Sequence, residues 1–201
     1  MLVLPLCYKN CPDKIPSNLS TKLGDGADGE VFLLNGEDDK VIKLSILVDY
    51  WEDYNLIFSN IENVFRFLMH EQPSTYARVF NFSKLTESFR YLHDGSKQNF
   101  ILYSYVMEKC FPLSEDEKKV FHSILSHEDL GIEKNYSEER VKEMLSGMAR
   151  GLDFDEERII FFYGNFKKVP IHHRDLHVRN IMKDAFGNFK LVDFDRTTLE
   201  I

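Results

Sequence analysis

Alternating hydrophobic and polar positions in the first half of the chain predict an antiparallel sheet. The span from Ser20 to Leu34 has the pattern of strand, glycine turn and strand, and the turn Asn35-Gly36 leads to a further strand at Lys40 to Leu44. Three later segments also have strand composition: Val79 to Phe82, Phe89 to His93 and Phe100 to Met107. We therefore expect these strands to form one sheet, beginning as a meander.

Helical periodicity interrupts the sheet once and then takes over the second half of the chain. From Asp53 to Met69 apolar residues recur at three- and four-residue spacing, which predicts one amphipathic helix. Three further segments have helical patterns: Ser114 to His122, Ser137 to Arg150 and Asp155 to Phe166. Two short strand-like pieces, Asn180 to Met182 and Phe189 to Val192, flank a turn. These elements predict one α+β domain over residues 1–201, with a sheet lobe over about 1–108 and a reduced helical lobe over about 109–201.

Composition and charge exclude several classes of function. The formal net charge of −8 at pH 7 argues against nucleic-acid binding, because phosphate contacts need clustered Lys and Arg. No apolar stretch approaches the roughly 20 residues of a membrane-spanning helix, and Met1 to Cys7 is too short for a signal peptide. Three cysteines argue against a disulfide framework and suit a reducing compartment. We expect a cytoplasmic protein with no nucleic-acid or membrane partner.

A glycine-rich turn is the first motif with chemical meaning. Gly24, Gly26, Gly29 and Val31 form a G-x-G-x-x-G-x-V pattern between two predicted strands. Such a turn lets backbone N–H groups approach phosphate oxygens closely, because no side chain intervenes. The alternative is a plain hairpin turn.

A lysine on the next predicted strand is the second candidate. In the K-V-I-K run that starts at Lys40, alternation puts Val41 and Lys43 on the same strand face. Lys43 is therefore expected to project beneath the glycine turn. The alternative is an exposed strand lysine.

The third motif runs from His173 to Asn180, H-R-D-L-H-V-R-N, and is followed by D-F-D at Asp193. Asp175, Asn180 and Asp193 would supply one carboxylate for a substrate hydroxyl and two oxygen ligands for magnesium. The alternative is that the acidic residues form turns and that His173 is a core histidine.

Taken in order, the three motifs resemble those of the protein-kinase superfamily, from Leu23 to about Asp195. The resemblance implies a two-lobed protein-kinase-like fold with an antiparallel-sheet N-lobe and a truncated helical C-lobe. It also implies ATP and Mg²⁺ as cofactors, with Lys43 holding the α- and β-phosphates. Asp175 would orient the acceptor hydroxyl and accept its proton.

In this family a helical glutamate holds the lysine. Glu62, nineteen residues after Lys43, has the best spacing, and Glu52 and Glu71 are alternatives that fit less well. A solvated helix charge is the other interpretation for all three.

The resemblance also implies an adenine pocket. The strand that ends at Met107, followed by Glu108, Lys109 and Cys110, is similar to the family's hinge, whose backbone binds adenine. Four apolar residues would line the pocket: Val31 and Val41 above, Met182 below and Met107 at the back. Ordinary core packing would also explain these four.

Two residues depart from the pattern of most eukaryotic protein kinases. His177 and Asp195 instead resemble haspin-type kinases and the aminoglycoside and choline phosphotransferases. The short remainder after Asp195 resembles minimal effector kinases that some pathogens inject, which makes the host cytoplasm a second expected location. We expect a minimal serine/threonine-protein kinase with a protein substrate or an activating protein partner. The alternatives are a small-molecule kinase and a kinase-fold binding module with little activity.

Overall fold

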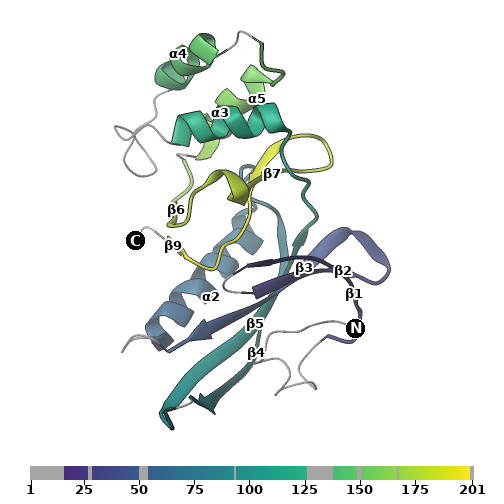
Figure 1. Cartoon of the computed structure of the whole chain (residues 1–201), viewed down its shortest axis with the longest axis vertical. Helices are drawn as coiled ribbons and strands as arrows, with labels where there is room; N and C mark the ends of the chain where they lie inside the picture. The colour runs from purple at the N-terminus through teal and green to yellow at the C-terminus, as the bar shows by residue number, and fades with distance from the viewer. Residues whose placement is uncertain are drawn as a thin grey trace. The chain divides into compact units, whose positions relative to one another are not determined.

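A computed structural model describes residues 16–26, 29–49, 54–92, 94–125, 138–148, 151–166 and 168–199 (Figure 1). Over these residues the chain is α+β, with a five-stranded antiparallel sheet and four α-helices. The chain divides into two units. The first combines the residues up to Glu71 with Arg78–Lys109, and the second combines Gln72–Ala77 with the residues from Cys110 onward.

The first unit is built on a sheet with strand order β1-β2-β3-β5-β4, in which all neighbours are antiparallel. Its strands are β1 (Leu19–Gly26), β2 (Gly29–Leu34), β3 (Glu37–Val48), β4 (Val79–Tyr91) and β5 (Lys97–Glu108). Gly36, with φ of 82°, closes the turn between β2 and β3, as the Asn-Gly signal predicts. The meander predicted at the start of the chain is therefore confirmed.

Strand β4 corrects the sequence prediction, because the two short strands expected at Val79 to Phe82 and Phe89 to His93 are one continuous strand. The polar stretch between them pairs with β5 throughout, with register shifts between Val79 and Asn81 and between Lys84 and Thr86. These shifts and the largely polar side chains obscure a simple alternation, which explains why the pattern suggested a break.

Opposite faces of the sheet carry different cores. On one face, six side chains from the central strands form an aliphatic and aromatic cluster: Phe32, Leu34, Ile42, Leu44, Phe100 and Leu102. On the other face lies α2 (Tyr54–Glu71), whose Phe65 packs on Phe82 of β4 and Tyr105 of β5, with ring centroids 4.6 and 4.5 Å apart (Figure 1). Lys43 is the cross-strand partner of Tyr105, so its side chain points to the α2 face.

Gly29 is required by close packing rather than by turn geometry. A Cβ at this position would lie 2.2 Å from the carbonyl oxygen of Leu44 and 3.0 Å from the Cα of Ser45, both backbone atoms of β3. We expect Gly29→Ala to lower the free energy of unfolding by about 1–3 kcal/mol, because β2 and β3 must separate. Urea denaturation measures this loss. Gly24→Ala is the matched control, since a Cβ there meets nothing within 4 Å, and an equal loss in both variants would contradict the packing explanation.

The second unit combines helices with two small antiparallel sheets. Its helices are α3 (Glu115–Leu125), α4 (Glu138–Met148) and α5 (Glu156–Phe166). Strand β6 (Ile171–His173) pairs with β9 (Thr197–Leu199), and β7 (Ile181–Lys183) pairs with β8 (Phe189–Leu191). The 3₁₀ helix η3 (Val178–Asn180) lies between β6 and β7, so Asn180 ends a 3₁₀ turn and does not begin a strand as expected.

Aromatic packing joins the helices of this unit to its β7–β8 hairpin. The ring of Phe121 on α3 lies 4.9 Å from that of Phe189 on β8 and 5.8 Å from that of Phe162 on α5. The segment Gln72–Ala77 belongs to the same unit, because Leu191 of β8 donates its N–H to the Thr75 carbonyl at 2.8 Å. Among the described residues, no helix is both long and apolar enough to cross a membrane.

Candidate functional site

Hydrogen bonds link the segments that carry three predicted site residues of the second unit. The side-chain Nδ2 of buried Asn180 donates to the backbone carbonyl of Asp175 at 2.9 Å. The backbone carbonyl of Asn180 accepts the N–H of Val192, also at 2.9 Å. Asp193 directly follows Val192, so Asp175, Asn180 and Asp193 are joined through this short series of hydrogen bonds.

Asn180 and Asp193 each carry a side-chain oxygen of the kind that magnesium prefers. The Asn180 amide nitrogen is only a donor, so its Oδ1 is the one side-chain atom that could bind a metal. Asp193 has φ of 65°, a conformation uncommon outside glycine that clusters at functional sites. The described residues contain no group of three or more His, Cys, Asp or Glu side chains placed to hold a metal. Two protein oxygens still suit Mg²⁺, which commonly takes further ligands from water and substrate phosphates.

His173 supports the same loop from inside the core. Its ring is almost fully buried, and Nε2 lies 2.9 Å from the carbonyl oxygen of Val192, the residue before Asp193. Burial lowers the pKa of His173 below its ordinary value of 6.5, although the carbonyl and nearby carboxylates oppose the shift. The neutral ring therefore donates from Nε2 and ties β6 to the segment that carries Asp193.

The lowered pKa of His173 predicts a pH-dependent stability. The unfolded chain binds more protons than the folded one below about pH 6.5, so the free energy of unfolding should fall as the pH drops through that value. His173→Gln is the informative variant, since its amide can still donate to the Val192 carbonyl but takes up no proton. Urea denaturation between about pH 8 and about pH 5 should show a smaller decline for His173→Gln than for the wild type. Parallel declines would mean that His173 contributes nothing to the pH dependence.

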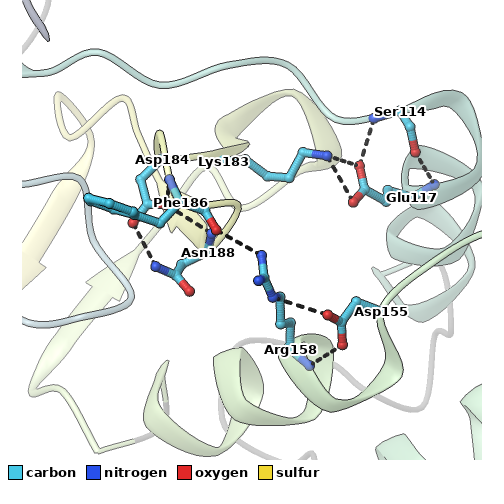
Figure 2. Close-up of polar contacts among 8 residues, drawn as sticks. All are labelled: Ser114, Glu117, Asp155, Arg158, Lys183, Asp184, Phe186 and Asn188. Atoms are coloured by element: carbon cyan, nitrogen blue, oxygen red, sulfur yellow. Dashed lines mark hydrogen bonds and ion pairs between the residues drawn. The ribbon is translucent and has the colours of Figure 1, made fainter.

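Strands β7 and β8 connect Asn180 to Asp193, and α3 holds this hairpin from one side (Figure 2). Lys183 Nζ lies 3.0 Å from Oε1 and 2.8 Å from Oε2 of Glu117. Glu117 also accepts the N–H of Ser114 at 2.7 Å and donates its own N–H to Ser114 Oγ at 3.2 Å, which is a capping box. Burial alone would raise the pKa of Glu117, but hydrogen bonds from Lys183 and Ser114 hold it below its ordinary value.

Helix α5 holds the tip of the same hairpin (Figure 2). Arg158 donates from Nη1 to the carbonyl of Phe186 at 3.0 Å, and its Nε lies 3.0 Å from Asp155 Oδ2. Asp184 stabilises the turn itself by accepting the N–H groups of Phe186 and Asn188, both at 2.9 Å. The sequence prediction missed these anchors. The S-x-x-E pattern at Ser114 was the available signal for the cap, but nothing local indicates that Glu117 would reach Lys183.

In the first unit, the glycine motif lies on the paired strands β1 and β2. Gly26 is opposite Gly29, and Gly24 is opposite Val31, while residues 27 and 28 lie outside the described part of the chain. Val31 is also opposite Lys43 of β3. The side chain of Lys43 is not exposed on the strand, since only 4% of the residue is accessible.

The pairing of Lys43 with Glu62 stays a prediction, and Lys43 lies on the sheet face that α2 covers. Glu62 is half-buried on α2. Ile61 and Phe65 occupy the helix face against the sheet, which leaves Glu62 at the edge of that face. Of the alternatives, Glu71 lies 2.7 Å from His70 Nδ1, and Glu52 lies outside the described residues.

The predicted hinge begins on β5 and crosses from one unit to the other. Met107 is buried opposite Val41. The N–H of Glu108 donates to the Arg78 carbonyl and that of Lys109 to the Asp39 carbonyl, both at 2.8 Å. These two N–H groups therefore cannot also donate to adenine without losing a bond. Cys110 and Met182, which belong to the second unit, are both half-buried.

No protein-family model matches the chain, and a search of the curated proteins finds no match. The three sequence motifs and the geometry of the residues that carry them are therefore the features that indicate a function.

Proposed function

We propose that the chain is an ATP- and magnesium-dependent phosphotransferase of the protein-kinase-like superfamily, and specifically a minimal serine/threonine-protein kinase. The observation that supports this most strongly is the hydrogen-bonded arrangement of Asp175, Asn180 and Asp193 within one unit. Phosphoryl transfer requires mainly positioning and charge neutralisation, which such an arrangement can supply.

Each residue has a distinct role in the proposed reaction. The Asp175 carboxylate orients the acceptor hydroxyl and takes its proton as the phosphoryl group arrives. Asn180 Oδ1 and the Asp193 carboxylate hold magnesium, which neutralises phosphate charge when bound. In the first unit, Lys43 binds the α- and β-phosphates, and the backbone around Gly24 and Gly26 can approach phosphate oxygens closely, since these residues carry no side chain.

Transfer of labelled γ-phosphate from ATP tests the proposal. The purified chain is incubated with protein mixtures and, separately, with a panel of small alcohols that includes choline and aminoglycosides, and mass spectrometry locates the phosphate. We expect labelled serine or threonine. Phosphate on a small alcohol alone would favour the small-molecule kinase, and nucleotide binding without transfer would favour a binding module.

The same assay, repeated with cell extract, tests the proposed protein partner. If the cytoplasm of the producing cell or of a host contains a substrate or an activating partner, cell extract should raise the initial rate of phosphate transfer to short peptides. A partner can do so by holding the acceptor at high effective concentration. Rates that extract leaves unchanged would contradict this part of the proposal.

A further inference from the structure

Both ring nitrogens of His177 lie near other residues of the loop between β6 and β7. His177 is the N-cap of η3, with extended backbone angles of φ −145° and ψ 166°. Its Nδ1 accepts the backbone N–H of Arg179 at 3.2 Å, and its backbone carbonyl accepts the N–H of Asn180 at 2.9 Å. The ring therefore stabilises the 3₁₀ turn that ends at Asn180.

The cap fixes the position of the ring hydrogen. A neutral imidazole has one donor and one acceptor nitrogen, so a ring that accepts at Nδ1 carries its hydrogen on Nε2. That Nε2 lies 3.7 Å from Oδ2 of Asp175. This distance is longer than a hydrogen bond. The N–H dipole still attracts the negative carboxylate, so it favours the carboxylate orientation in which Oδ2 faces Nε2. Catalytic hydrogen bonds are often long without substrate and tighten in the reacting complex.

A histidine at position 177 offers more than capping of η3 requires. Asn, Asp and Ser are the residues preferred at a helix N-cap, and each uses only one acceptor atom there. A second nitrogen directed at Asp175 adds nothing to a cap. We propose that His177 is a positioning residue, whose Nδ1 holds η3 and whose Nε2–H orients the Asp175 carboxylate toward the acceptor hydroxyl. The catalytic part of this inference rests on the proposed phosphotransferase function.

Two substitutions test the roles of the two ring nitrogens of His177 separately. In His177→Asn the amide oxygen takes the place of Nδ1, so the cap is kept and the donor to Asp175 is lost. In His177→Gln the amide nitrogen takes the place of Nε2, so the donor is kept and the cap is lost. His177→Ala loses both, and His70→Asn, at an exposed histidine near the end of α2, is the matched control.

Kinetics and thermal unfolding are measured for all four variants. We expect His177→Asn to keep the wild-type unfolding midpoint and the KM for ATP while kcat falls about tenfold. His177→Gln should have a lower unfolding midpoint but a kcat within about threefold of the wild type, well above His177→Ala. Wild-type kcat in His177→Asn, or equal kcat in the Gln and Ala variants, would overturn the proposal.

The tautomer of His177 is measured without any activity assay. Nitrogen-15 NMR of the full chain at neutral pH should show the Nε2–H form for the ring signals that disappear in His177→Asn. The carboxyl carbon of Asp175 should shift in that variant and not in His70→Asn. An Nδ1–H tautomer overturns the inference whatever the activity. A wild-type chain that transfers no phosphate but shows the Nε2–H form refutes the proposed function and leaves the geometric inference standing.

Discussion

Asp175→Asn should lower phosphate transfer by about 10²–10⁴-fold while the affinity for ATP stays near the wild-type value. The amide has the shape of the carboxylate but cannot accept the hydroxyl proton. The substitution should also leave the loop intact, because Asn180 bonds to the backbone carbonyl of Asp175 and not to its side chain. The Asp175 side chain itself is 38% exposed, so the fold does not depend on burying it.

Two measurements test this first prediction together. Steady-state kinetics give kcat, and calorimetry gives the dissociation constant for ATP with magnesium. Asp153→Asn is the matched control, since Asp153 is an exposed aspartate of the same unit. If Asp175→Asn retains most of its turnover, the catalytic loop has been assigned to the wrong residues.

Local patterns were sufficient to predict most of the sheet and the helices. The Asn35-Gly36 turn fixes the β2–β3 connection, and helical spacing of apolar residues predicts α2, since both signals act within a few residues. The small sheet formed by β6 and β9 in the second unit could not be predicted in this way. β6 and β9 have three residues each and pair across the whole β7–β8 hairpin, so no periodicity could reveal them.

The same distinction applies to the candidate site. Motif spacing predicted that Asp175, Asn180 and Asp193 belong together. In the structure, hydrogen bonds link Asn180 to Asp175 and to Val192, the residue before Asp193. Spacing could not predict which way Glu62 faces, because a rotation of one residue along a helix changes its direction by about 100°. Nor could it indicate that Glu117 would pair with Lys183, 66 residues away.

Asp193→Asn is expected to weaken ATP binding about tenfold or more when magnesium is present, and to change it little when magnesium is absent. A hard cation prefers a charged carboxylate oxygen to a neutral amide oxygen, so the loss should appear only with the metal. The backbone should tolerate the change. Asp193 has φ of 65°, and Asn adopts this left-handed conformation more readily than most residues.

Calorimetry with and without magnesium measures the binding loss, and Asp193→Ala separates it from damage to the fold. Alanine also removes the carboxylate, but it adds a left-handed backbone strain of about 1–2 kcal/mol. Both variants should therefore lose magnesium-dependent affinity, while only Asp193→Ala should show a clearly lower unfolding midpoint. Equal losses of ATP affinity with and without magnesium in Asp193→Asn would mean that the substitution disturbs the loop and that Asp193 is not a metal ligand.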